Sequence, residues 1–365
     1  MRSKLSYNLI VRLGGILILF VFWKCNQSDS ISYKTFEQLP KIDIHSHYKY
    51  SREYLPEFLN KWNMKTVLVD VALEDEDSLV RNFDNYLDHY KEFSQYFFLC
   101  TTFTAAGIEN PDFIKKTLEQ LQKDLSRGAT MVKVWKNFGM VTQDSLGNYI
   151  MINDERLNPI WDFLVEKNIP VIAHIGDPEQ AWRPLKDPHN PHYNYYKNNP
   201  EYHAYNFPNI PSYQQIIQAR DQWVQKNPNL KIIAAHLASM ANNISEVALR
   251  LDNYPNLSVE LGARFGDLAM QDSKTVNAFF ERYQNRILFG TDFGNSKPDT
   301  LLSKEDLETE LNNLDKDYQL LFNYLVKSDS IVVRNQKTKG LGLSENVLAK
   351  IFSENFFRIL ENKSF

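Results

Sequence analysis

Two histidines separated by one residue, His45 and His47, end the short apolar segment Pro40-Lys-Ile-Asp-Ile-His-Ser-His47. In a β-strand, residues i and i+2 point to the same face, so both imidazoles would converge at the end of the strand. Two converging imidazoles suit a metal ion. A hydrogen-bonded or solvated histidine pair explains this motif equally well when it is taken alone. Matching ligands elsewhere in the chain must therefore decide between the two interpretations.

Apolar segments of strand length recur along the chain, and helical patterns separate them. We predict eight strands: Lys41–His47, Thr66–Ala72, Phe97–Phe103, Thr130–Lys136, Pro170–Gly176, Lys231–Leu237, Leu257–Ala263 and Arg286–Asp292. Helices are predicted at Pro111–Ser126, Asn153–Lys167 and Ser212–Gln225, with a closing helix at Ser344–Leu360 whose N-cap is Ser344. The alternation predicts an α/β fold, a (β/α)8 TIM barrel over residues 39–365. A doubly wound open sheet is the competitor, but no Gly-x-Gly-x-x-Gly follows any predicted strand.

Two segments interrupt the alternation. Residues 177–211, between the fifth and sixth strands, are crowded with Pro, Asn, Tyr and His. Irregular segments of that length are usually lids or binding loops. Lys297–Lys339, after the eighth strand, is polar and charged, with one amphipathic piece near Tyr318–Leu325.

The predicted strand ends carry most of the residues that could do chemistry. In a TIM barrel the active site lies at the C-terminal ends of the strands. These ends hold His45, His47, Lys133, His174, His236 and Asp292. Four of the eight histidines fall there, on three different strands. Scattered core histidines would not be expected to choose these positions, so the joint pattern predicts a metal site.

The same residues belong to motifs that resemble a known family. The segments His45-Ser-His47, Ala173-His174-Ile-Gly-Asp-Pro178, Ala235-His236-Leu and Phe289-Gly-Thr-Asp292 closely resemble the amidohydrolase superfamily. The nearest branch is that of the amidohydrolase-related (amidohydrolase 2) proteins, which includes aminocarboxymuconate-semialdehyde-type decarboxylases. The resemblance covers nearly the whole chain from about residue 38. It implies that His45, His47, His174 and Asp292 surround one divalent metal ion, with zinc the best match to this ligand set.

The reaction implied by the resemblance is hydrolysis of an amide, lactone or ester bond by a metal-activated water. A bound metal lowers the pKa of water from about 15.7 to about 7. Asp292 would take the proton of this water and pass it to the leaving group, and His236 would polarise the substrate carbonyl. The alternative is a non-oxidative decarboxylase of an unsaturated or aromatic acid that uses the same metal site. A third interpretation is a binding protein that has the same barrel but no catalytic activity. The complete set of metal ligands, with Asp292 present, disfavours it.

Lys133 is the ambiguous member of this group. Its neighbours in the predicted fourth strand are apolar, and a buried ammonium must pair, shift its pKa or be modified. In some members of the superfamily a lysine on this strand is carbamylated and bridges two metals. Lys133 is therefore either a ligand of a second metal or a contact to substrate, and we expect a single metal. We expect Lys136, at the edge of the strand, to be a solvated charge.

Other polar residues are candidates for binding substrate. Arg264, just past the seventh strand, could hold a substrate carboxylate through two parallel hydrogen bonds, although a salt bridge to a neighbouring loop competes with this role. Asp177 and Arg183 are candidate contacts from the long segment 177–211. We expect His192, which lies among Pro and Asn residues of this segment, to be solvated.

Composition excludes several classes of protein. The formal net charge is −4, and no block of Lys and Arg appears, so nucleic acid is not an expected partner. The chain has only two cysteines, Cys25 and Cys100. This number excludes a disulfide framework and a cysteine-rich zinc site.

The first 25 residues differ in character from the rest. Arg2, Lys4 and Arg12 precede the apolar run Leu13–Trp23, which predicts a signal peptide or an N-terminal membrane anchor. Cys25 stands where a bacterial lipoprotein is lipidated, but Lys24 departs from the small residue of that signal, so cleavage is left open. Residues 26–38 would be a linker. We expect an exported, membrane-anchored protein, periplasmic or at the cell surface. Its partners would be a small-molecule substrate and the membrane, and a homodimer is left open.

Overall fold

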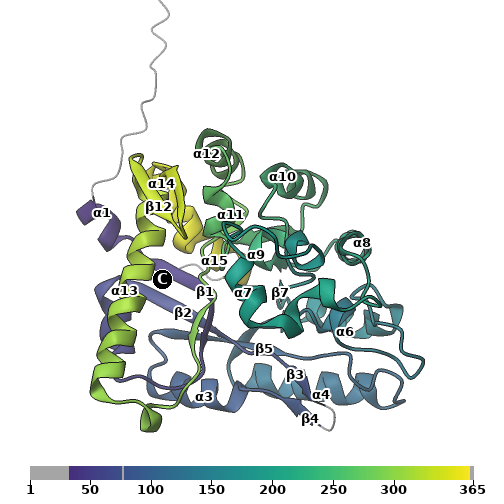
Figure 1. Cartoon of the computed structure of the whole chain (residues 1–365). Coiled ribbons are helices and arrows are strands. Elements are labelled where there is room, and N and C mark those ends of the chain that lie inside the picture. Colours follow the sequence, from purple (N-terminus) through teal and green to yellow (C-terminus); the bar gives the residue numbers. More distant parts are fainter. Residues whose placement is uncertain (1–32, 76–77, 362–365) are drawn as a thin grey trace, which may run out of the picture.

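Eight segments of the chain form a parallel β-barrel with helices around its outside (Figure 1). The computed structural model describes residues 33–75 and 78–361. The strands follow the order β10-β9-β8-β7-β6-β5-β2-β1-β11. Because β10 pairs with β9 while β11, just after it in the chain, pairs with β1, the last strand closes the sheet on itself. The structure confirms the predicted TIM barrel.

All eight predicted strands are present, several of them shorter than expected. They are β1 (Lys41–Tyr48), β2 (Met64–Val69), β5 (Phe97–Thr102), β6 (Ala129–Val134), β7 (Val171–Ala173), β8 (Ile232–Ala234), β9 (Leu257–Glu260) and the two-part last strand β10 (Ile287–Leu288) and β11 (Phe293–Asn295). β7 and β8 are fully buried, as continuous apolar sequence predicts for strands covered on both faces.

The predicted helices are also present. The longer helices are α2 (Leu55–Lys61), α3 (Phe83–Glu92), α4 (Phe113–Ser126), α6 (Asn158–Glu166), α8 (Tyr213–Lys226), α10 (Ile244–Asn253), α12 (Ser273–Arg282) and α13 (Lys304–Val326), and the chain closes with α14 (Glu345–Ala349), a π-helical turn (Lys350–Glu354) and α15 (Asn355–Leu360). Ser344 caps α14, as predicted, by accepting a hydrogen bond from the N–H of Val347. Shorter helices are α1 (Tyr33–Gln38), α7 (Tyr193–Asn198) and α11 (Phe265–Ala269). The short segments α5 (Asn137–Met140) and α9 (Ala235–Ala238) contain residues with non-helical backbone angles and are turns.

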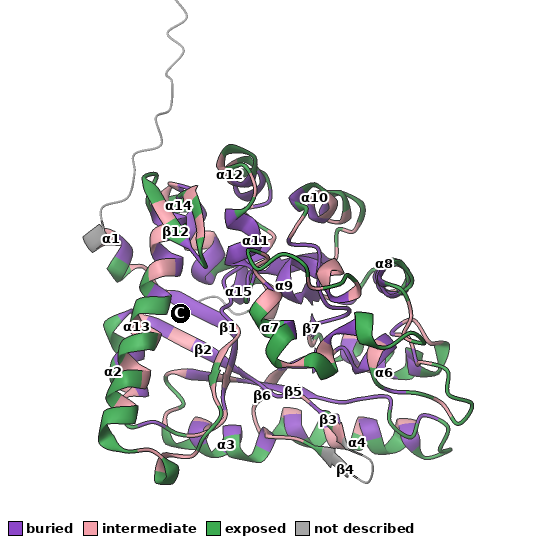
Figure 2. Ribbon diagram, in the orientation of Figure 1, coloured by how far each residue is buried: buried purple, intermediate pink, exposed green. Residues whose placement is uncertain are grey.

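Two apolar layers hold the barrel together. Alternate strand residues such as Ile44, Val69 and Met131 fill the interior, where Phe356 and Phe357 of α15 pack against them. The residues between these positions face outward and pack against the helices in a larger cluster. The strands are accordingly buried, while the outer faces of the helices are exposed (Figure 2). Because both faces of the strands are covered by apolar side chains, polar side chains lie mainly at the ends of the barrel.

The segment after the last strand is more ordered than its polar sequence indicates. Residues 304–326 form the single long helix α13, and Ser303 and Asp306 form a capping box at its start. The amphipathic piece near Tyr318–Leu325 is the part of α13 whose apolar side chains are buried, and Leu311 and Leu314 nearer its start are partly buried against the same core. A hairpin of β12 (Ser330–Val333) and β13 (Gln336–Lys339) follows, and a smaller one, β3 (Leu73–Asp75) and β4 (Ser78–Val80), follows β2. Neither hairpin was predicted from the sequence.

The predicted leader and Cys25 lie outside the described residues. At the end of the predicted linker, α1 is helical and Phe36 is buried. Within residues 33–75 and 78–361, no helix has the length and apolar character needed to cross a bilayer.

Candidate metal centre and substrate cavity

β1 places His45 and His47 inside the C-terminal end of the barrel. Its pairing with β2 shifts by one residue just after Asp43, and such a bulge turns the following side chains to the other face of the strand. Ile42 and Ile44 fill the barrel interior before the shift takes effect. After it, His45 and His47 occupy the interior positions, with their rings 5.1 Å apart. The predicted convergence of the two imidazoles is confirmed.

His45 is buried and makes contacts through both ring nitrogens. Its Nδ1 lies 3.1 Å from Oε1 of Glu260. Its Nε2 lies 3.3 Å from Oδ1 of Asp292 and 3.1 Å from Nζ of Lys133. Because a carboxylate only accepts hydrogen bonds, Nδ1 carries the ring proton. The lone pair of Nε2 therefore points toward Asp292 and Lys133. Burial, reinforced by Lys133, lowers the pKa of His45, so this ring is neutral at pH 7.

Glu260, at the end of β9, is the central residue that sequence analysis missed. Besides His45, it accepts hydrogen bonds from the backbone N–H groups of His236 and Gly262, both at 2.6 Å. Burial raises the pKa of a carboxyl group, but His45, the N–H of His236 and Lys133 hold the pKa of Glu260 below its ordinary value. A side chain at Gly262 or Gly290 would clash with the carboxylate. The sequence signal was a carboxylate that ends an apolar strand and is followed two residues later by glycine.

His47 lies between this buried group and the cavity. Its Nδ1 donates to the carbonyl oxygen of Val69 at 2.9 Å, so Nδ1 carries the ring proton. Its Nε2 lies 3.1 Å from Oδ1 of Asp292. The lone pair of Nε2 therefore faces the same carboxylate oxygen as that of His45.

His236 and His174 contribute two further lone pairs. His236 Nδ1 donates to the carbonyl oxygen of Gly262 at 2.8 Å, and its Nε2 lies 3.2 Å from Nδ1 of His174. His174 Nε2 donates to Asp177 at 3.2 Å. Burial lowers the pKa of His174 to about 4, so the ring is neutral at pH 7 and its Nδ1 is unprotonated. Two unprotonated nitrogens thus face each other.

The turn after β8 that presents His236 is conformationally costly. His236 and the next three residues, through Ser239, all have positive φ angles, between 53° and 58°. Each such residue costs about 1–2 kcal/mol relative to an ordinary conformation. Neighbouring groups hold the turn in place: Ser239 donates to the carbonyl oxygen of Gly176 at 2.5 Å, and the Tyr213 hydroxyl donates to that of Ser239 at 2.9 Å. This support allows the turn to aim His236 into the barrel.

Asp292 completes the group from the last strand. Its φ of 65° turns the side chain toward the histidines, and its N–H donates to the carbonyl oxygen of His45 at 2.8 Å. Burial by itself raises the pKa of this carboxyl, and positive charge on the surrounding imidazoles or on a bound cation holds the pKa of Asp292 well below its usual range. Asp43 fixes the strand around it, since it accepts hydrogen bonds from Thr291 and from the N–H of His45.

These residues fit a divalent cation. The ligand atoms of His45, His236 and Asp292 all lie within 4.8 Å of one another, and His47 and His174 adjoin them through the contacts above. Four imidazole lone pairs and a carboxylate oxygen are packed together, and hydrogen-bond acceptors at these distances repel one another unless a cation lies among them. Neutral imidazole and carboxylate are the ligands that zinc and related ions bind. The chain therefore carries a candidate metal centre built from the residues that the sequence indicated.

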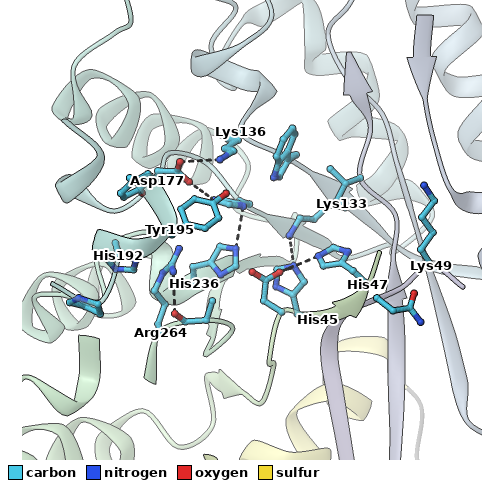
Figure 3. A pocket seen from close by; sticks show the side chains of 18 of the residues that line it. His45, His47, Lys49, Lys133, Lys136, Asp177, His192, Tyr195, His236 and Arg264 are labelled. Carbon is cyan, nitrogen blue, oxygen red and sulfur yellow. Dashed lines mark hydrogen bonds and ion pairs between the residues drawn. The ribbon is translucent and has the colours of Figure 1, made fainter. Parts of the chain in front are cut away.

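Lys133 lies beside this centre inside the barrel. Its neighbours in β6, Val132 and Val134, belong to the outer apolar layer, so Lys133 faces inward. Burial lowers the pKa of its amine. Its Nζ contacts Nε2 of His45, as Figure 3 shows. The role of Lys133 at a second metal stays a prediction.

A cavity of about 460 Å³ opens onto the centre (Figure 3). Its charged lining is mostly basic: five side chains, Lys49, Lys133, Lys136, Arg264 and Arg334, stand against the two carboxylates of Asp177 and Asp292. Aromatic side chains, among them Tyr86, Trp135, Tyr195 and Tyr196, line other parts of it. The cavity is therefore suited to a small anionic molecule with an apolar or aromatic part.

The predicted substrate contacts divide into two groups. Arg264 and Asp177 line the cavity. Arg183 is not among the described residues that line it; its side chain is 62 % exposed and pairs with Glu179 at 2.5 Å. The long segment thus brings only part of its polar surface to the site.

Two residues expected to be solvated are instead buried, so these predictions were wrong. Lys136 pairs with Asp177 at 3.0 Å, and its amine lies 4.2 Å from the centre of the Tyr202 ring. His192 Nε2 lies 2.9 Å from both carboxylate oxygens of Asp267. The reason is the same for both: the segment 177–211 packs over the strand ends and covers side chains that look peripheral in the sequence.

The fold and the site define a TIM-barrel protein with a candidate metal centre at the C-terminal end of its strands. A family model described as Amidohydrolase matches residues 102–360, well over half of the chain. The chain therefore belongs to the amidohydrolase family, as the sequence motifs predicted.

Solved structures of low sequence identity share the fold. An uncharacterized TIM-barrel protein, Bb4693, from Bordetella bronchiseptica is 15 % identical, with 88 % of this chain and 99 % of that chain covered and a TM-score of 0.51. A 2,6-dihydroxybenzoate decarboxylase from Rhizobium is 13 % identical, with 88 % and 99 % covered and a TM-score of 0.50. No curated protein matches the sequence.

Proposed function

We propose that this protein is a metal-dependent hydrolase that cleaves an ester, lactone or amide bond in a substrate bearing a carboxylate. One observation carries the proposal: unprotonated imidazole nitrogens and Asp292 converge at the end of a cavity whose charged lining is mostly basic. The converging lone pairs supply a metal site, and the basic lining supplies attraction for an anion.

Zinc is the metal we propose, held by His45, His47, His174 and Asp292. A divalent ion there would acidify a water molecule and polarise the carbonyl of the substrate. The same ion would keep Asp292 ionised, so Asp292 could accept a proton at neutral pH and return it to a leaving group. His236, neutral because burial lowers its pKa well below the ordinary value, stands beside Asp292 and orients the substrate carbonyl.

The basic residues would position the substrate. Lys133 lies next to the centre, where an ammonium stabilises the negative charge that develops on the carbonyl oxygen during hydrolysis. Arg264 lines the wall of the cavity and can pair with the substrate carboxylate through two parallel hydrogen bonds. A carboxylate paired with a guanidinium is stabilised and retained, which favours hydrolysis over loss of that group as carbon dioxide.

The alternative is a non-oxidative decarboxylase of an unsaturated or aromatic acid. The aromatic lining supports this second candidate, because Trp135 and Tyr195 offer flat faces to an aromatic ring. In that reaction the carboxylate of the substrate would lie at the metal centre, and Lys133 would be placed to protonate the carbon that loses carbon dioxide.

Substrate profiling separates the two candidates. Purified protein is assayed with aryl esters, lactones and amides that carry a carboxylate, with their uncharged analogues, and with hydroxybenzoic acids. We expect hydrolysis of the carboxylate-bearing compounds, no release of carbon dioxide, and a loss of about 10²- to 10⁴-fold in Asp292→Asn. Asp252→Asn, which changes an aspartate on the surface, is the matched control. Release of carbon dioxide without hydrolysis would replace the hydrolase by the decarboxylase.

The proposal extends to the location of the protein. The basic and apolar residues 1–25 support export and tethering to a membrane, with Cys25 as the candidate lipidated residue. Detergent-phase partitioning of the full chain is compared with that of a chain beginning at Ser28, and we expect only the full chain to enter the detergent phase. Equal partitioning of the two chains would refute the predicted membrane tether. Gel filtration of the shorter chain would test for a homodimer.

A further inference from the structure

Arg334 reaches the cavity from a part of the chain that the metal motifs do not include. It lies at the tip of the β12–β13 hairpin and lines the same cavity as Arg264. The turn consists of Arg334 and Asn335, whose φ angles are 47° and 69°. Two positive φ angles in a two-residue hairpin turn are adopted at least cost by Asn and Gly. An arginine at this position therefore costs conformational free energy, and its charge lies at the cavity.

Packing fixes the hairpin tip against the cavity wall. A Cβ placed on Gly266 in α11 would lie 3.1 Å from Cβ of Pro191 and 3.3 Å from Cβ of Arg334. The side-chain amide of Gln336 donates to the carbonyl oxygen of His189 at 2.9 Å. The tip is thus seated between the segment 177–211 and α11, whose first residue directly follows Arg264. Arg264 and Arg334 consequently come to the same wall of the cavity.

Both guanidinium groups lack a carboxylate partner within the described part of the chain. Arg264 is only 7 % exposed; its Nη1 donates to the carbonyl oxygen of Ala263, and its buried Nε has no hydrogen-bond partner among the described residues. The carboxylate of Asp267, three residues on, is already paired with His192. A buried donor without a partner is costly, and an anionic ligand would satisfy it. Figure 3 shows Arg264 beside His236.

We infer that Arg264 and Arg334 together bind a carboxylate of the substrate, with the β12–β13 hairpin supplying the outer half of the site. This inference depends on the proposed function only in assuming that the bound anion is a substrate. The anion site itself is inferred from the positions of the two arginines. Arg264 contacts the carboxylate from the buried wall, and Arg334 contacts it from the exposed hairpin tip. The hairpin is thus a specificity element for anionic substrates.

Binding of a simple carboxylate tests this inference without turnover. Benzoate and its neutral analogue benzamide are titrated by calorimetry into the metal-loaded protein and into Arg334→Gln, Arg264→Gln and the control Arg183→Gln. We expect benzoate to bind more tightly than benzamide, and Arg334→Gln and Arg264→Gln each to weaken benzoate by about 10-fold or more. Arg183→Gln should leave both affinities unchanged, because that side chain pairs with Glu179 on the surface.

The outcomes separate this inference from the proposed reaction. Benzoate affinity unchanged in Arg334→Gln, or benzamide bound as tightly as benzoate, would overturn it. Arg334 is exposed at a hairpin tip, so its substitution tests the site even if Arg264→Gln fails to fold. If the protein binds benzoate through both arginines but hydrolyses none of the tested compounds, the proposed function is refuted. The inferred anion site is then still supported. On a hydrolysed anionic substrate, Arg334→Gln should raise KM with little change in kcat.

Discussion

Lys41 and Lys133 are both buried lysines on barrel strands, and they lie near opposite ends of the barrel in opposite surroundings. The amine of Lys41, at the start of β1, contacts four backbone carbonyl oxygens, those of Phe36, Glu37, Leu39 and Trp62, at 2.8–3.2 Å. The amine of Lys133 has His45 Nε2 as its near neighbour and faces the cavity. Burial lowers the pKa of both amines.

The comparison separates a stabilising site from a reactive one. At Lys41 every donor of the amine has a carbonyl oxygen within reach, so the amine serves the fold and joins α1 and α2 to the barrel. At Lys133 the surrounding groups are imidazole lone pairs and the Asp292 carboxylate. The amine contacts Nε2 of His45, and the acceptors that remain repel one another and need a metal ion or a substrate. A buried lysine therefore indicates function only when its neighbours are left unsatisfied without a ligand.

The largest effect should follow loss of the metal centre. We expect removal of metal by a chelator, or the substitution His45→Ala, to lower kcat/KM by about 10³-fold or more, because both the activated water and the orientation of Asp292 depend on it. Re-addition of zinc should restore the chelated wild type and fail to restore His45→Ala. Metal content by mass spectrometry accompanies the kinetics. Activity that survived both treatments would refute a metal mechanism.

The two lysines should then respond in opposite ways to the same substitution. Lys133→Met should lower kcat by about 10²-fold while changing the free energy of unfolding little, because it removes a charge that aids the reaction. Lys41→Met should leave kcat of the folded protein intact and lower the free energy of unfolding by about 3 kcal/mol, because buried carbonyls lose their donor. Urea unfolding and steady-state kinetics on both variants give the answer. Similar effects in the two variants would abolish the distinction.

A smaller effect is expected at Glu260, which holds His45 in the productive tautomer. Glu260→Gln keeps the shape but replaces an acceptor of three hydrogen bonds by an amide, so we expect metal affinity to fall about 10- to 100-fold. Competition with a chromophoric chelator measures the affinity. Glu310→Gln, a carboxylate that pairs with Arg52 away from the centre, is the control. Unchanged affinity in Glu260→Gln would show that Glu260 only fills space.

The last expected effect is on stability rather than on activity: a dependence of the free energy of unfolding on pH. The pKa of His174 is about 4 in the folded protein and 6.5 ordinarily, so between these values the unfolded chain binds the extra proton. Stability of the chelated protein should therefore fall as pH is lowered from 6.5 toward 4, by about 3 kcal/mol from this group. Urea unfolding of the wild type and of His174→Gln across this pH range isolates the contribution of His174 to the free energy of unfolding. An equal slope in the variant would assign the dependence to other groups.

Local sequence determined much of this protein. Apolar runs bounded by turn residues predicted the strands, because a strand covered on both faces has to be apolar along its length. The ends of these strands then located His45, His47, His174, His236 and Asp292, because parallel strands of a barrel present their C-terminal ends together. The hydrophobic pattern did not predict most of α13, because only its C-terminal part, from Tyr318 onward, is buried.

Tertiary structure alone decided which other residues join the centre. Glu260 became the partner of His45 because two glycines let its carboxylate approach, and Arg334 reached the cavity because a hairpin packs between two distant segments. Arg183, by contrast, lies on the surface although its segment covers the site. Such outcomes depend on the sum of many weak contacts between segments far apart in the chain, which no local pattern encodes. The sequence determined where the chemistry lies, and the packing of loops and hairpins around the barrel decided which charges surround it.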